Sequence, residues 1–82
     1  MCAKRRKRND IYELIAYNIK KQRKLAGITQ AQLADRTGYS HEYIRRIEAP
    51  SSVKHFSIDT ISIIADALDI DIRNLFDKLE DE

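Results

Sequence analysis

The sequence predicts an all-α domain of five helices. Apolar side chains recur every three or four residues in five segments, which is the period of an amphipathic helix. A residue that favours helix starts (Ser, Thr or Asp) stands at the beginning of each segment. The chain has only two glycines and one proline, and no segment shows the apolar–polar alternation of a strand. Its 82 residues suffice for one small domain.

The first helix is expected to begin at Asn9 or Asp10, because Asp10 and Glu13 have the spacing of a capping box. Its apolar stripe has four-residue spacing and consists of Ile11, Ile15 and Ile19. Gly27 should end it, because glycine readily adopts the left-handed conformation of a helix stop. Residues 1–8 contain five consecutive cations and little to pack, so we expect a disordered basic arm.

Two short helices should follow, joined by a turn at Gly38. Thr29 and Gln32 have capping-box spacing at the start of one, and Ser40 can cap the other. Pro50 should end the second of them, because proline lacks the N–H that a helix needs. The side chains expected to face inward are Leu33, Ala34, Thr37, Ile44 and Ile47. Short helices with so brief a connection have helix-turn-helix spacing.

Two further helices are expected in the second half of the chain. Ser57 can cap the fourth helix and Asp71 the fifth. The apolar face of the fourth consists of Ile58, Ile61, Ile64, Ala65 and Leu68. That of the fifth consists of Ile72, Leu75, Phe76 and Leu79. The domain is therefore expected to span residues 9–79, followed by an acidic tail at residues 80–82.

Charge is divided unevenly along the chain. Residues 1–55 contain 13 Lys and Arg against 5 Asp and Glu, whereas residues 56–82 contain 2 against 8. This asymmetry suggests that one face meets a polyanion. A single cysteine rules out an internal disulfide and agrees with a cytoplasmic location. No apolar run is long enough to span a bilayer.

Several classes of function lack the residues that they need. The chain has no glycine-rich phosphate loop and no nucleophile beside a base, so we do not expect an enzyme. Two histidines and one cysteine at scattered positions do not make a metal site, and no cofactor is expected.

Short motifs spread over residues 11–79 resemble those of one known family. They are Ile19-Lys-Lys-Gln-Arg23, Gly27-Ile-Thr-Gln30, Leu33-Ala34, Gly38-Tyr-Ser40, Tyr43-Ile44, Ile47-Glu48, Ala65-x-Ala67-Leu68-x-Ile70 and Leu75-Phe76. As a set they resemble the phage-repressor-like helix-turn-helix family of the Cro/repressor or XRE type. The resemblance implies a lambda-repressor-like fold. It also implies a bacterial or phage-encoded transcriptional regulator that binds double-stranded DNA, a repressor rather than an activator.

The resemblance also assigns positions that would contact DNA. Those that would approach the backbone are Thr29, Gln30, Tyr43 and Arg45. Those that would read bases are Ser40, His41, Glu42 and Arg46. Arg46 can bond a guanine through two donors, and Glu42 can accept from a cytosine amine. Gln30 would also brace the helix that reads the bases.

These side chains have plainer alternatives. Arg45 and Arg46 can pair with Glu42 on a solvated helix face. His41 can be an ordinary surface residue, and Tyr43 can serve mainly in packing. The rival function is a protein-interaction module that touches DNA weakly. The excess of basic residues on this face favours DNA.

Arg23 and Glu48 are expected to form a structural ion pair. Arg23 continues the four-residue series of the first helix, so its side chain should point partly inward. An inward arginine needs a carboxylate, because an unpaired buried charge is costly. Glu48 follows Ile47 at the end of the third helix, and the family pattern implies the same pair.

The segment after the third helix departs from the family pattern. Members often have a glycine soon after the glutamate and a proline before the next helix, whereas here Pro50 comes early and Phe56 precedes Ser57. The candidate phosphate contacts in this segment are Ser51, Ser52 and Lys54, and the alternative is a solvated polar loop. Likewise, the basic arm can bind the DNA backbone or a minor groove, or merely aid solubility.

A single reading helix covers few base pairs, so a homodimer is expected. Its surface would consist of Ile70, Ile72, Phe76 and Leu79, some of which can instead close the core of one chain. The operators would be inverted repeats with half-sites about 34 Å apart, which is one turn of DNA.

Overall fold

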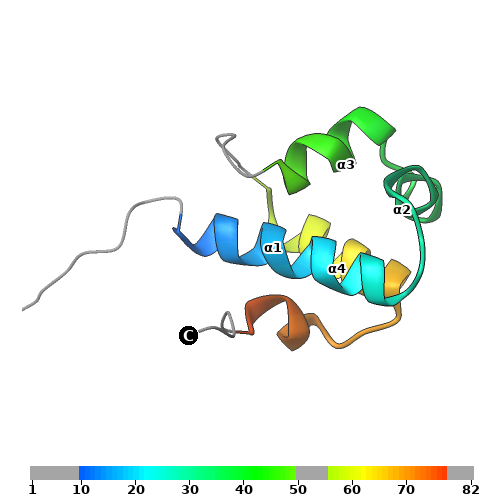
Figure 1. Cartoon of the computed structure of the whole chain (residues 1–82). Coiled ribbons are helices and arrows are strands. Elements are labelled where there is room, and N and C mark those ends of the chain that lie inside the picture. The colour runs from blue at the N-terminus through cyan, green and yellow to red at the C-terminus, as the bar shows by residue number, and fades with distance from the viewer. Residues whose placement is uncertain (1–9, 50–55, 78–82) are drawn as a thin grey trace, which may run out of the picture.

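In the computed structural model, which describes residues 10–49 and 56–77, the chain forms four α-helices and one 3-10 helix (Figure 1). They are α1 (Asp10–Leu25), α2 (Gln30–Thr37), α3 (His41–Glu48), α4 (Ile58–Leu68) and η1 (Ile72–Phe76). No strand occurs within the two described ranges, so the all-α prediction is confirmed. The predicted basic arm and acidic tail lie outside these ranges, as do the candidate contacts Ser51, Ser52 and Lys54.

The fifth helix differs from the prediction. It is a 3-10 helix of five residues rather than an α-helix that continues to Leu79, which lies outside the described residues. Its start is tight because the Asp71 carboxylate accepts from the Arg73 N–H and the Asp71 carbonyl from the Asn74 N–H. Its end is also fixed, since the carbonyls of Leu75 and Asp77 accept from the Asn18 side chain instead of from N–H groups of a further helical turn.

Three of the predicted caps begin α-helices. At α2 the Thr29 hydroxyl accepts from the Gln32 N–H at 3.0 Å, and the Gln32 side chain accepts from the Thr29 N–H at 2.8 Å. This capping box satisfies N–H donors for which the helix has no main-chain acceptor. Ser40 caps α3 and Ser57 caps α4 in the same way, each through its hydroxyl.

Gly38 turns the chain between α2 and α3. Its φ of 84° lies in the left-handed region, which costs glycine little and other residues more. Its N–H binds the Ala34 carbonyl at 2.9 Å, so α2 ends in a closed turn. The two helices thereby leave Gly38 at a sharp angle, and this makes the connection short enough for a helix-turn-helix.

Helix α1 lies at the centre of the arrangement, with α3 on one side and η1 on the other, and α4 packs behind it (Figure 1). Helix α2 closes the end of the domain against α3 and α4. The buried apolar core consists of Ile15, Ile19, Leu33, Ala34, Ile44, Ile47, Ile61, Ile64, Ala65, Leu68 and Leu75. Every one of the five elements therefore contributes to one core.

Three residues of the predicted apolar faces are exposed, one of which is Phe76 on η1. Ile11 and Ile58 both lie in the first turn of a helix, α1 and α4, and both are exposed. A first turn projects beyond the neighbouring helices, so helical period alone does not bury it. No helix in the described part of the chain is long and apolar enough to cross a membrane.

Candidate nucleic-acid interface

Helices α2 and α3 form the candidate interface, and the core decides which side of α3 is free. Ile44, Ile47 and Glu48 are buried, so one side of the helix is fastened to the domain. The opposite side is exposed and carries His41, Glu42, Arg45 and Arg46, which we call the reading face. Helix α3 lies at the edge of the molecule (Figure 1). It is therefore placed to enter a groove as wide as a helix.

The reading face carries charges of both signs. Glu42 Oε1 lies 3.3 Å from Arg45 Nη2, and both side chains are more than half exposed. Such a pair contributes about 0.3–0.5 kcal/mol, so an incoming phosphate can replace the carboxylate at little cost. Arg46 forms no ion pair with any described residue, and it lines a shallow depression of about 250 Å³ with Glu42, Arg45 and Ala49. The structure thus contains the Arg45–Glu42 pair that the sequence offered as an alternative, and Arg46 is free of ion pairs with described residues.

Tyr43 has a packing role at the edge of the reading face. Its ring meets that of Tyr39 edge to face, with centroids 4.9 Å apart. The Tyr39 hydroxyl in turn lies 3.3 Å from the Thr60 hydroxyl of α4. The start of α3 is therefore tied to α4 through two aromatic rings. Sequence reasoning missed Tyr39, although its place directly after Gly38 is a signal for a residue that anchors the turn.

A polar junction holds the start of α2 and the end of α3 onto α1. Arg23 Nε lies 2.8 Å from Glu48 Oε2, and Arg23 Nη2 lies 3.0 Å from Glu48 Oε1. The third guanidinium nitrogen, Nη1, donates to the Ile28 carbonyl at 2.9 Å. Gln30 Nε2 adds a hydrogen bond of 3.0 Å to Glu48 Oε1. The structure thus contains the ion pair that the sequence indicated, and Gln30 braces α3 through Glu48.

The remaining predicted positions lie beside this unit. Thr29 and Ser40 are exposed cap residues at the starts of α2 and α3, and their hydroxyls accept from the N–H groups of Gln32 and Tyr43. On η1, Ile72 is half-buried against the core, as is Ile70 before it, whereas Phe76 is 39% exposed. Leu79 lies outside the described residues.

Sequence reasoning missed two side chains that hold the frame of the interface. Asn18 is fully buried and donates to the carbonyls of Leu75 and Asp77 at 3.0 and 2.9 Å. Its position three residues after Ile15, on the apolar stripe of α1, was the available signal. Arg36 donates to the Ala67 carbonyl at 3.1 Å and ties α2 to the end of α4. An exposed arginine on a short helix gives no such signal.

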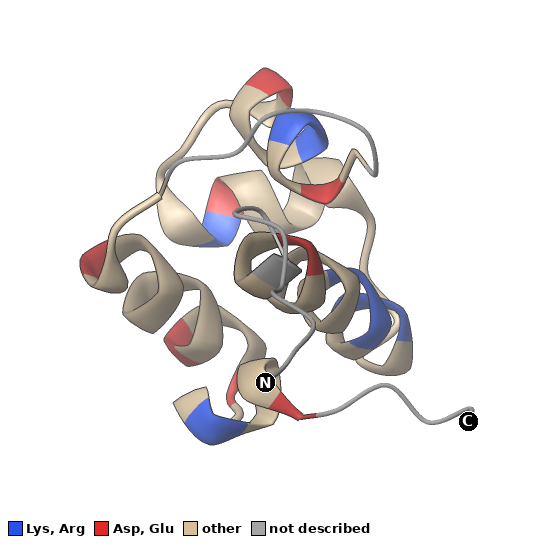
Figure 2. Ribbon diagram, turned by 90° about the vertical axis from the view of Figure 1, so that its left-hand side faces the viewer, with Lys and Arg blue, Asp and Glu red and all other residues tan. Residues whose placement is uncertain are grey.

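The distribution of charge follows the two halves of the domain. Figure 2 shows basic segments in the second half of α1 and acidic segments on α4. Among the described residues, no group of three or more His, Cys, Asp or Glu side chains is arranged to hold a metal ion. The described side chains of this surface can form ionic contacts and hydrogen bonds.

Known proteins resemble this chain in family and in fold. A helix-turn-helix family model matches residues 19–75. The crystal structure of the restriction-modification controller protein C.AhdI from Aeromonas hydrophila is similar, with a TM-score of 0.71 and 28% identity over 79% of this chain and 96% of that one. The hypothetical transcription factor NHTF from Neisseria shares the fold, with a TM-score of 0.75 and 24% identity over 93% and 85%. No curated protein sequence matches the chain.

Proposed function

Because the chain belongs to the Cro/repressor-like helix-turn-helix family of DNA-binding transcription regulators, we propose that it is a sequence-specific repressor acting as a homodimer. Its role is then binding rather than catalysis, on the chromosome or phage genome in the cytoplasm. The similarity to the controller C.AhdI favours a restriction–modification system as the regulated genes. The observation that carries the proposal is the exposed reading face of α3, fastened from behind by the core and by the Arg23–Glu48 junction.

In this proposal α3 lies in the major groove. Arg46 is unpaired among the described residues and long enough to bond a guanine through two donors, and Glu42 accepts from a cytosine amine. Ser40 and His41, at the start of α3, reach neighbouring bases. The backbone contacts would come from Thr29, Gln30, Tyr43, Arg45, Ser51, Ser52 and Lys54. Such contacts position the helix without reading sequence.

The homodimer would place two reading helices on an inverted repeat. Phe76 on η1 is 39% exposed, and such a dimer would cover its ring, which supports this part of the proposal. The interface would use Ile70, Ile72, Phe76 and Leu79. Half-sites would then lie about 34 Å apart.

The test is selection of bound fragments from sheared host DNA at near-physiological salt, followed by footprinting. We expect a protected inverted repeat, and we expect Arg46→Ala to relax preference at one base by about 1–3 kcal/mol. Arg45→Ala is the matched control, because it removes the same charge one residue away. It should weaken binding to all sequences alike. Binding without sequence preference by the unaltered chain would favour the protein-interaction module instead.

A further inference from the structure

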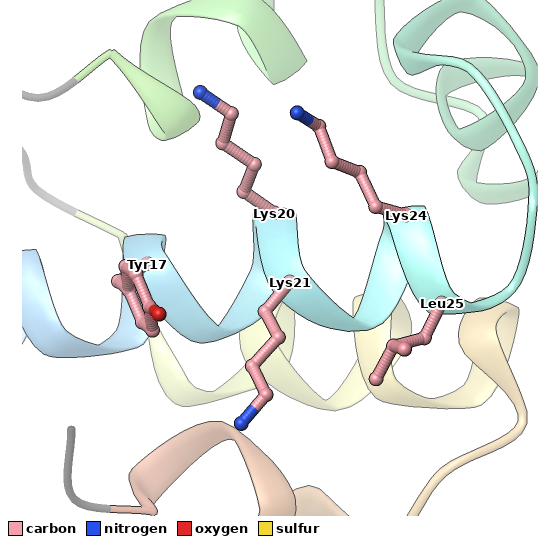
Figure 3. Close-up of a pocket in the computed structure, with 5 residues that line it drawn as sticks. All are labelled: Tyr17, Lys20, Lys21, Lys24 and Leu25. Carbon is pink, nitrogen blue, oxygen red and sulfur yellow. The ribbon is translucent and has the colours of Figure 1, made fainter. Parts of the chain in front are cut away.

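A groove of about 450 Å³ runs along α1, outside the reading face. It is lined by Tyr17, Lys20, Lys21, Lys24 and Leu25 (Figure 3). The lysines do not all point the same way. Lys20 and Lys24 extend from α1 toward the side of α2 and α3, whereas Lys21 extends toward η1 (Figure 3). The groove therefore presents two ammonium groups on the side of the helix-turn-helix.

These ammonium groups have no anionic partner within the described part of the chain. Arg23 lies between them in sequence, but each nitrogen of its guanidinium already donates to Glu48 or to Ile28. Lys20 and Lys24 are four residues apart, so they are neighbours on one helix face, where like charges repel. An external anion would relieve this repulsion, and a repeating anion would relieve it at both positions.

The junction fixes where these lysines stand relative to the reading face. Arg23 meets Glu48 at the end of α3, and Gln30 meets it from the start of α2. Lys20 is one helical turn before Arg23 and Lys24 directly follows it, so both flank the place where the two helices of the unit meet α1. A duplex that receives α3 in its major groove has its sugar–phosphate backbones on either side of that groove.

We propose that Lys20 and Lys24 bind phosphate groups of the DNA backbone beside the segment read by α3. The proposal rests on the proposed function, since it needs a duplex on α3. Lys21 takes no part, because it extends toward η1, which is flanked by Asp71 and Asp77. An acidic protein segment is the competing occupant. It would engage all three lysines and the exposed Tyr17 and Leu25 alike.

The experiment measures the affinity of the full chain for a duplex of mixed sequence and for the selected operator as a function of salt. We compare the unaltered chain, Lys20→Gln/Lys24→Gln, and Lys21→Gln as the matched control. Each lost phosphate contact should reduce the slope of log affinity against log salt by about 0.9, or about 1.8 for the pair. The affinity deficit of the double variant should grow about tenfold as salt falls from about 200 to about 50 mM. Glutamine preserves helix propensity, and urea unfolding of each variant verifies the fold.

The outcomes separate this proposal from the proposed function. A reduced slope on both duplexes for the double variant, with Lys21→Gln near the unaltered chain, supports the phosphate contacts. A reduction from Lys21→Gln of about half that of the double variant, which is the same loss per charge removed, would show a general effect of charge and overturn them. An unaltered slope in the double variant overturns them too. In that case the proposed function still stands if Arg46→Ala loses base preference. If the unaltered chain binds neither duplex, the proposed function fails and takes this inference with it.

Discussion

Two buried polar junctions anchor neighbouring elements to α1. One is formed by charged groups and the other by neutral groups. Arg23 holds the end of α3 through a charged pair with Glu48, in which the side chains are 9% and 2% exposed. Asn18, a little more than one turn earlier, holds the end of η1 through a neutral amide and two main-chain carbonyls. The charged junction orients the reading helix. The neutral junction closes the far side of the domain.

The difference shows what a sequence reveals about buried polar groups. A buried charge needs an opposite charge, and that partner is itself a residue that a reader can find. A buried amide needs only a hydrogen bond, and here its partners are carbonyls that every residue possesses. The partner of Arg23 was therefore open to prediction, whereas the partners of Asn18 were not, although both side chains lie on the inner side of α1.

The largest expected effect comes from leaving the charged junction half-built. Glu48→Ala strands a buried guanidinium and should lower the free energy of unfolding by about 3–5 kcal/mol, measured by urea denaturation. The control is Arg23→Met/Glu48→Ala, which removes both charges and should recover much of the loss. A loss below about 1 kcal/mol in the single variant would mean that the pair orients α3 without stabilising it.

The neutral junction should be weaker. Asn18→Ala removes the donor from two carbonyls and should cost about 1–3 kcal/mol in the same measurement. Asn18→Leu fills the same space without a donor. If leucine restored the stability that alanine removes, the lost packing volume and not the hydrogen bonds would explain the effect. Hydrogen exchange should place the loosening at η1, leaving α3 protected.

Gln30 offers a finer test of the charged junction. Gln30→Ala removes one hydrogen bond to Glu48 Oε1 and should cost about 1 kcal/mol of stability. Gln30→Glu should cost more, because it places a second carboxylate beside Glu48. Equal effects of the two substitutions would show that the contact with Glu48 is not maintained in solution.

The smallest effect is expected at an exposed pair with nearly the same fork geometry. Arg73 Nε and Nη2 lie 3.2 and 3.0 Å from the Asp71 carboxylate, with side chains 87% and 51% exposed. The side-chain hydrogen bonds from Arg73 hold the pKa of Asp71 below its ordinary value of 3.8. Because this pKa is lowered on folding, the stabilisation is complete above about pH 4 and is lost as the pH falls further.

Asp71→Asn isolates that charge, because asparagine still accepts from the Arg73 N–H. The difference in urea midpoint between the unaltered chain and this variant should be small and constant from about pH 7 to pH 5. It should shrink as the pH falls below about 4. A difference that grows on acidification would contradict the assigned direction of the pKa shift.

The sequence predicted the starts of the helices and the buried side of α3, but not the type of the fifth helix. Thr29, Ser40 and Ser57 begin helices as expected, because a capping hydroxyl acts on donors within its own turn. The prediction of a fifth α-helix was wrong in helix type. Asn18, which is distant in sequence, binds the carbonyls at the end of η1, and the local apolar period does not reveal that contact. For the reading face, the helical period correctly separates buried Ile44 and Ile47 from exposed Arg45 and Arg46. Their contacts with DNA stay predictions.

The third hydrogen bond of Arg23, to the Ile28 carbonyl, bears on how this chain can vary in length. The Arg23 side chain sets the length of the link between α1 and α2, because it binds Glu48 of α3 and the Ile28 carbonyl near the end of the link at the same time. Leu25 and Ala26 are exposed and open to substitution. An insertion among them would force the guanidinium to release either Ile28 or Glu48. Sequences that descend from this one should therefore vary in residue type at this link but keep the same number of residues.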